Sequence, residues 1–163
     1  VPPWGAIIAH RQTSGRGQLR RGWVSPPGNL YVSFLLPQDI AGLGTLASLA
    51  TGFMVHAALL SMNIPTRLKW PNDLLLSMET GEGKFGGLLL EEKGGRLVAG
   101  LGLNLRSAPE DGIMRPGKAV PASALPSFEG SVFPFWLNLV SAMRAAYAVS
   151  LAGATPGRLC PAA

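Results

Sequence analysis

The chain has 163 residues, of which 47% are hydrophobic and 14% are charged, and it carries a net charge of +5. This length and composition indicate one globular domain with a buried core and exclude a disordered chain. The only charged residues in 1–38 are four arginines, which predict a focused positive patch suited to phosphate-bearing ligands. The single cysteine, Cys160, excludes an internal disulfide, and no secretory signal opens the chain, so a cytoplasmic location is expected.

Hydrophobic patterning predicts several short strands. They are expected where β-branched, aromatic or densely apolar residues cluster, at 6–10, 29–36, 66–70, 85–91 and 96–105. Residues 73–77 are predicted to continue the strand 66–70 past an interruption at Pro71. The polar segments 79–84 and 92–95 predict two hairpin turns.

Two helices are predicted. The first covers 42–63, where interspersed Thr, Ser and His residues favour a buried helix over a membrane span. The second covers 133–151, with apolar side chains at helical spacing. Residues 106–131 contain four prolines and predict an irregular connection. The order of elements predicts an α+β fold in which helices cover a mixed, largely antiparallel sheet.

The loop 11–28 is rich in glycine and arginine. Gly15 and Gly17 flank Arg16, and glycines let backbone N–H groups approach a ligand closely. Successive N–H groups form an anion site, and the Arg16 guanidinium matches phosphate or carboxylate oxygens. Trp23 offers a flat apolar face on which a purine can stack. An isolated Gly-Arg-Gly would instead indicate a solvated loop, but the residues that follow, from Trp23 to Tyr31, argue against that interpretation.

A second dense segment, Lys69-Trp70-Pro71-Asn72-Asp73-Leu74, combines a cation, an amide and a carboxylate. Its lysine can face a phosphate and its aspartate can act on an amine; a strand-to-turn junction with capped polar groups is the alternative. Gly100-Leu-Gly-Leu-Asn104-Leu105 is no dinucleotide-binding fingerprint, because the third glycine is missing and no helix follows. His56 is expected to be a hydrogen-bonded core residue, and no Cys/His cluster has zinc spacing.

These segments together resemble the catalytic domain of biotin–protein ligases. The resemblance rests on Gly15-Arg16-Gly17 with Trp23, on Lys69–Leu74, on Lys84–Glu91 and on Gly100–Leu105. It implies the biotin/lipoate ligase-like catalytic fold, which is related to that of class II aminoacyl-tRNA synthetases.

The resemblance also implies roles for individual residues. Biotin-binding roles fall to Gln12, Arg16, Gly17, Gln18 and Lys84. Nucleotide-binding roles fall to Arg21, Trp23, Lys69 and Asn104. Catalytic roles fall to Arg16, Lys69, Asp73 and Lys84, while no metal ligand is assigned. Gln18 stands where family members often carry a second arginine, which predicts weaker retention of the adenylate, offset in part by Arg20.

The implied chemistry has two steps. The carboxylate of biotin attacks the α-phosphate of ATP to give biotinyl-5′-AMP, and a lysine of a biotin carboxyl carrier protein then takes the biotinyl group. ATP and biotin are therefore the expected substrates, with Mg²⁺ assisting. The carrier protein is the expected partner, and neither nucleic acid nor a membrane is expected. The oligomeric state is left open, with a homodimer as one option.

One catalytic domain is expected over 1–152, followed by a tail over 153–163. The Ser/Thr-Thr-Asn segment that precedes the first strand in the family has no counterpart, so a truncated N-terminus is expected. Neither a DNA-binding domain nor a C-terminal β-barrel domain is predicted. Three alternatives stay open: lipoate or octanoate transfer, a non-catalytic or partly active biotin- or nucleotide-binding remnant, and nucleic-acid binding by the basic loop.

Overall fold

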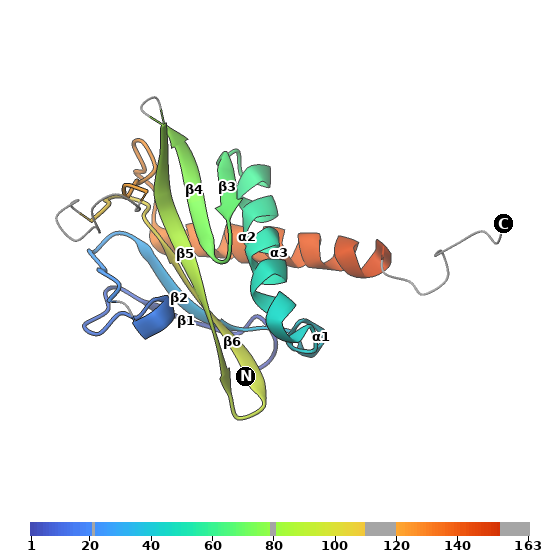
Figure 1. Ribbon diagram of the computed structural model, residues 1–163. Coiled ribbons are helices and arrows are strands. Elements are labelled where there is room, and N and C mark those ends of the chain that lie inside the picture. Colours follow the sequence, from blue (N-terminus) through green and yellow to red (C-terminus); the bar gives the residue numbers. More distant parts are fainter. Residues whose placement is uncertain (21, 79–80, 110–119, 154–163) are drawn as a thin grey trace.

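A six-stranded antiparallel sheet forms the centre of the molecule (Figure 1). The computed structural model describes residues 1–20, 22–78, 81–109 and 120–153. The strands lie in the order β1-β2-β6-β5-β4-β3. Their bounds are β1 Ala6–Ala9, β2 Leu30–Leu35, β3 Thr66–Lys69, β4 Asp73–Met78, β5 Gly81–Lys93 and β6 Arg96–Leu103. All five neighbouring pairs are antiparallel, so the largely antiparallel prediction is confirmed; the one parallel pairing in the described residues is the isolated bridge between Lys84 and Ala122.

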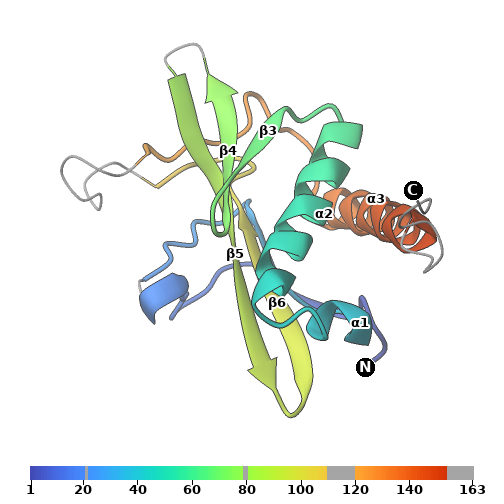
Figure 2. The ribbon, with the colours of Figure 1, turned by 45° about the vertical axis from the view of Figure 1, so that its right-hand side comes forward.

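Helices cover one face of this sheet, as predicted. They are α1 (Gln38–Ala41), α2 (Ala47–Ser61) and α3 (Val132–Gly153), with 3-10 turns at Gln18–Arg20 and Gly44–Leu46. Figure 2 shows α2 and α3 on one side of β5 and β6, and the turn at Gln18–Arg20, in blue, on the other. The sheet therefore has a helix-covered face and an open face beneath the arginine–glycine loop.

The core lies between the sheet and the helices. Alternate residues of β2 point into it, because side chains in a strand alternate between faces: Val32 and Phe34 are buried while Ser33 is exposed. Val55 and Leu59 of α2 and Leu139 of α3 are fully buried against this layer. Gly44–Ser61 and Val132–Ser150 are long and apolar enough to span a membrane by length and composition alone, a test that core helices also pass.

The helix predicted over 42–63 is shorter than expected. It is observed as α2, which begins only at Ala47, after the separate helix α1 and a 3-10 turn, and ends at Ser61. Gly44 has a φ of 57°, a left-handed conformation that interrupts regular helix geometry between the two. The hydrogen bond expected for His56 is confirmed, since its Nδ1 lies 3.0 Å from the Thr66 hydroxyl, but the residue is half-buried and lies at the edge of the core.

Residues 73–77 form a strand, as predicted, but they do not continue the strand 66–70. The chain reverses between β3 and β4, which pair antiparallel with Lys69 opposite Asp73, and the Trp70–Pro71 peptide bond is cis. Asn72 fixes this turn against β5, because its side-chain amide donates to the Leu88 carbonyl at 2.6 Å and its carbonyl accepts from the Leu88 N–H at 2.9 Å.

The remaining boundaries shift by smaller amounts. β5 starts at Gly81, inside the segment predicted as a turn, and residues 79–80 of that turn lie outside the described residues. The predicted C-terminal helix is confirmed as α3. The predicted irregular connection is described over 106–109 and 120–131, where it includes the unpredicted bridge from Ala122 to Lys84. The predicted tail is described only at Gly153, the last residue of α3.

A hydrogen bond joins α3 to α1 and makes the free energy of unfolding depend on pH in the alkaline range. The Tyr147 hydroxyl donates to the Asp39 carboxylate at 2.6 Å. Burial, this hydrogen bond and the negative charge of Asp39 raise the pKa of Tyr147 from 10.0 to about 12. Because the fold favours the neutral phenol, the stabilisation is complete below pH 10.0 and is lost as pH rises through about 12. We expect urea midpoints to fall across this window, and to fall less in Tyr147→Phe; equal pH profiles would contradict the assignment.

Candidate active site

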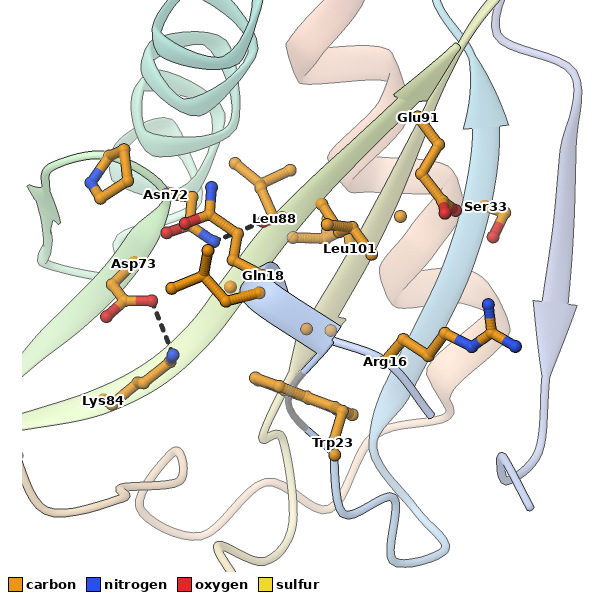
Figure 3. Close-up of a pocket in the computed structure, with 18 of the residues that line it drawn as sticks. Arg16, Gln18, Trp23, Ser33, Asn72, Asp73, Lys84, Leu88, Glu91 and Leu101 are labelled. Atoms are coloured by element: carbon orange, nitrogen blue, oxygen red, sulfur yellow. Dashed lines mark hydrogen bonds and ion pairs between the residues drawn. The ribbon is translucent and has the colours of Figure 1, made fainter. Parts of the chain in front are cut away.

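A cleft of about 760 Å³ lies on the open face of the sheet, beneath the arginine–glycine loop (Figure 3). Its walls come from that loop, from the turn between β3 and β4, and from Lys84 of β5. Segments far apart in sequence thus meet at one cavity. Of the predicted site residues, the cleft is lined by Gln12, Arg16, Gly17, Gln18, Trp23, Lys69, Asp73 and Lys84.

Glycines form much of the cleft floor. Gly87 and Gly102 are neighbours across β5 and β6, and Gly100 lies beside Ser33 of β2. Without side chains at these positions, a ligand can lie close to the sheet backbone. The Trp23 ring already does so, because a Cβ added at Gly102 would lie 2.7 Å from its Cζ2 atom. Glycine is therefore required at 102 for Trp23 to keep this position.

An ion pair joins Asp73 of β4 to Lys84 of β5. The Lys84 Nζ lies 2.6 Å from the Asp73 Oδ1, and the two side chains are 32% and 23% exposed. A β-bulge creates this geometry: Asp73 pairs with Gly87 and Leu75 pairs with Lys84, which leaves Phe85 as the extra residue. Phe85 is fully buried in the core, so Lys84 is directed to the open face.

The Trp23 ring also contacts this lysine. The Lys84 Nζ lies 5.4 Å from the ring centroid, within cation–π range. The Trp23 Nε1 is buried and has no hydrogen-bond partner among the described residues. Lys84 is thus held between a carboxylate and an aromatic ring, in a position where its charge can meet an anion.

The arginine–glycine loop is fixed at both ends. The Trp23 N–H donates to the Gly15 carbonyl at 2.9 Å, and the Ser25 hydroxyl donates to Gln12 Oε1 at 2.9 Å. Further along, the Tyr31 hydroxyl donates to the Pro26 carbonyl at 2.8 Å. Burial raises the pKa of Tyr31, with a smaller opposing effect from Asn29, so the hydroxyl keeps the proton that it donates.

Charge is divided between the two ends of the cleft. Figure 3 shows Asp73 and Lys84 at one end, and Arg16, Ser33 and Glu91 at the other. Arg16 forms no ion pair with the carboxylates of the described residues. Lys69 lines the cleft and is exposed. Among the described residues, the cleft is therefore lined by three basic side chains, Arg16, Lys69 and Lys84, of which Lys84 is paired with Asp73.

Two predicted nucleotide residues are not seen in the cleft. Arg21 lies outside the described residues. Asn104 is 2% exposed and is absent from the cleft lining, because its side chain is directed at backbone groups beneath the floor. A direct contact of Asn104 with the nucleotide stays a prediction.

The site residues predicted from the sequence do not include the floor or the far end of the cleft, although Leu88 and Leu101 lie in segments that carry the resemblance. The floor includes Leu88 and Leu101, and the far end includes Ser33 and Glu91. The alternation in β2 placed Ser33 on the face opposite the core, which was a usable signal. The contributions of Leu88 and Leu101 depend on the pairing of β5 with β6, where Leu88 lies opposite Leu101. That pairing is not local in sequence.

No closed metal site is seen in the residues that the structure describes, which contain no group of three or more His, Cys, Asp or Glu placed to hold an ion. Asp73, one of two carboxylates lining the cleft, is already paired with Lys84. The donor set therefore fits an ion that arrives on phosphate oxygens and not one held by protein ligands alone.

The sequence and the fold match known proteins. Residues 2–106 match the biotin/lipoate A/B protein ligase family. The biotin–[acetyl-CoA-carboxylase] ligase of Paracoccus denitrificans is 37% identical over 130 residues, covering 72% of this chain and 51% of that protein. The bifunctional ligase/repressor BirA of Bacillus subtilis is 33% identical over 68% of this chain and 35% of its own length. A biotin protein ligase from Aquifex aeolicus in complex with biotin and ATP has a TM-score of 0.70 at 30% identity, covering 89% of this chain and 61% of that one.

These matches agree with the antiparallel sheet and its covering helices. The chain spans about half the length of the Paracoccus ligase and a smaller share of BirA. The family match covers more than half of this chain and includes every predicted site residue. The chain therefore belongs to the biotin/lipoate A/B protein ligase family.

Proposed function

We propose that this chain activates biotin with ATP and transfers it to a lysine of a biotin carboxyl carrier protein. The observation that carries the proposal is the placement of Lys84 between Asp73 and Trp23, in a cleft that is also lined by Arg16 and Lys69. The Paracoccus relative is named a biotin–[acetyl-CoA-carboxylase] ligase, and the Aquifex structure holds biotin and ATP. These names favour biotin over lipoate as the substrate.

The first step joins two anions. The biotin carboxylate, already ionised at neutral pH, attacks the α-phosphorus of ATP; a P–O bond forms and pyrophosphate leaves. No base is required, so the protein's task is to neutralise charge. Lys84, Arg16 and Lys69 line the cleft and are the proposed source of that charge, with Arg21 as a further contributor. Mg²⁺ bound to the phosphates would supply further charge neutralisation.

The second step transfers the biotinyl group. The acceptor amine attacks the acyl carbon of biotinyl-5′-AMP, the acyl–O bond to phosphate breaks, AMP leaves, and the amine loses a proton. Asp73 is the proposed group that orients the amine or accepts its proton, because it is a carboxylate at the cleft wall, 23% exposed. Its ion pair with Lys84 must loosen or rearrange for this step.

Mass spectrometry of a carrier domain tests the proposal. Purified chain, biotin, ATP and Mg²⁺ are expected to add one biotinyl group to one carrier lysine, and omission of ATP is expected to abolish the addition. Biotin binding by calorimetry without any product would favour a binding remnant, while addition of lipoate in preference to biotin would favour the other transferases of the family. A cytoplasmic location belongs to the same proposal, because the ATP and the carrier that the reaction needs are found there.

Gln18 gives a prediction about how firmly the intermediate is held. It lines the cleft, where an amide can donate hydrogen bonds but brings no charge. Gln18→Arg would add a cation facing the adenylate phosphate, and an added charge-assisted contact is worth roughly 1.5–3 kcal/mol. We expect biotinyl-5′-AMP to leave the variant about tenfold or more slowly, as measured by release of labelled adenylate into a filtrate. Gln18→Met is the control; equal release from Gln18→Arg and wild type would contradict the prediction.

A further inference from the structure

Asn104 lies directly after β6, and it forms hydrogen bonds with backbone groups around Lys84. Its side-chain nitrogen lies 3.1 Å from the Ser123 carbonyl oxygen and 3.4 Å from the Lys84 carbonyl oxygen. Its backbone N–H donates to the Phe85 carbonyl at 2.8 Å. Asn104 is 2% exposed and does not line the cleft, so it contacts the β5 backbone at Lys84 and Phe85 and not the Lys84 ammonium group.

A second segment completes this support. The Lys84 N–H donates to the Pro121 carbonyl at 2.6 Å, and the Ser123 N–H donates to the Lys84 carbonyl at 2.9 Å. The segment after residue 120, orange in Figure 1, thus pairs with β5 in parallel at this one position. The Leu125 N–H closes the arrangement by donating to the Asn104 carbonyl at 3.2 Å. Asn104 therefore ties the end of β6, β5 and this segment together at Lys84.

The chemistry of the amide explains why asparagine suits this position. Two carbonyl oxygens face the side-chain nitrogen, and an amide NH₂ can donate to both, while the Asn104 Oδ1 is buried without a partner among the described residues. An aspartate would direct negative charge at the same two carbonyls. An apolar residue would remove the side-chain donor to the Ser123 carbonyl and leave the Lys84 carbonyl with the Ser123 N–H alone. Because buried polar groups are costly to leave unpaired, either change is expected to move the β5 backbone at Lys84.

We propose that Asn104 is a positioning residue for Lys84, acting through the backbone of β5 and the segment 121–123. The proposal rests on the proposed function, in which the Lys84 ammonium meets the biotin carboxylate. Asn104→Ala is expected to lower kcat/KM for biotin in ATP–pyrophosphate exchange by about 10- to 100-fold, the scale for displacing a reacting group by about 1 Å. The affinity for the non-hydrolysable analogue adenosine 5′-(β,γ-imido)triphosphate is expected to stay within about twofold of wild type, since Asn104 is absent from the cleft lining.

Asn29 supplies the matched control. It is 1% exposed, and its side chain donates to the Ser107 carbonyl and accepts from the N–H groups of Arg106 and Ser107, away from Lys84. Asn29→Ala removes an equally buried, backbone-bonded amide. A similar loss of kcat/KM in both variants at similar thermal stability would show a general structural effect and overturn the proposal.

Two further measurements separate the remaining outcomes. In a Lys84→Met background, adding Asn104→Ala is expected to cause no further loss of adenylation; a full additional loss, or weaker binding of the ATP analogue, would assign Asn104 to the nucleotide and overturn the proposal. If Asn104→Ala does not fold, Ser123→Pro is the substitute, because it removes the N–H that donates to the Lys84 carbonyl. The same decrease in kcat/KM for biotin is expected in that variant. Hydrogen exchange of the Lys84 amide is expected to rise in either variant, and unchanged exchange would contradict the proposal. An inactive wild type would instead refute the proposed function.

Discussion

Lys84→Met is expected to slow formation of biotinyl-5′-AMP by about 10²- to 10³-fold, equivalent to about 2–4 kcal/mol of transition-state stabilisation. Methionine keeps most of the side-chain volume, and its ring contact with Trp23 can persist. What is lost is the only cation that the structure places next to both Asp73 and Trp23 within the described residues. The effect is therefore expected in the chemical step and in biotin affinity, and not in folding.

Biotin-dependent exchange of labelled pyrophosphate into ATP measures this step without a carrier protein. Lys93→Met is the matched control, because Lys93 ends the same strand and is exposed outside the cleft lining. Since the Asp73–Lys84 pair is partly solvated, thermal stability is expected to change little. A wild-type exchange rate in Lys84→Met would remove this lysine from the mechanism.

Asp73→Asn is expected to act on the other half of the reaction. Transfer from preformed biotinyl-5′-AMP to the carrier lysine should slow by about 10²- to 10⁴-fold, the range for loss of a positioned general base. Asparagine retains the shape and can still accept a hydrogen bond from Lys84, so adenylate formation is expected to be affected less than transfer. A larger decrease in the rate of transfer than in the rate of adenylate formation would show that Asp73 acts on the amine. Equal decreases would show that Asp73 only positions Lys84.

Single-turnover transfer, started by mixing enzyme-bound adenylate with excess carrier domain, isolates this step. Glu82→Gln is a suitable control, because Glu82 pairs with Arg67 outside the cleft lining. If adenylate formation and transfer decline by the same factor in Asp73→Asn, the general-base role is wrong and the residue serves Lys84 alone.

Local sequence patterns predicted most of the secondary structure. Alternation in β2 and helical spacing in α3 each identified an element and its buried face, because those signals depend on neighbours along the chain. The break in the strand predicted over 66–77 was missed because it depends on contacts that are distant in sequence. The turn between β3 and β4 is fixed by hydrogen bonds between Asn72 and Leu88, sixteen residues apart. Non-local contacts of this kind leave no mark in a local pattern.

The site shows a similar division. The resemblance selected Gln12, Arg16, Asp73 and Lys84, all of which line the cleft. It did not reveal the bulge at Phe85 that directs Lys84 to the open face, nor the pairing of Lys84 with residues 121–123. Both depend on strand register across segments distant in sequence, which residue identity alone does not determine.

The register of β4 against β5 also makes the reactive pair independent of the loop that connects these strands. Asp73 and Lys84 are held by the bulge, by contacts from residues 121–123, and by the ladder, which continues past Lys84 to the pair of Met78 with Gly81. Extra residues inserted at that connection would therefore leave the register at Asp73 and Lys84 unchanged. An affinity tag or fluorescent label placed there would leave the proposed reactive centre in place.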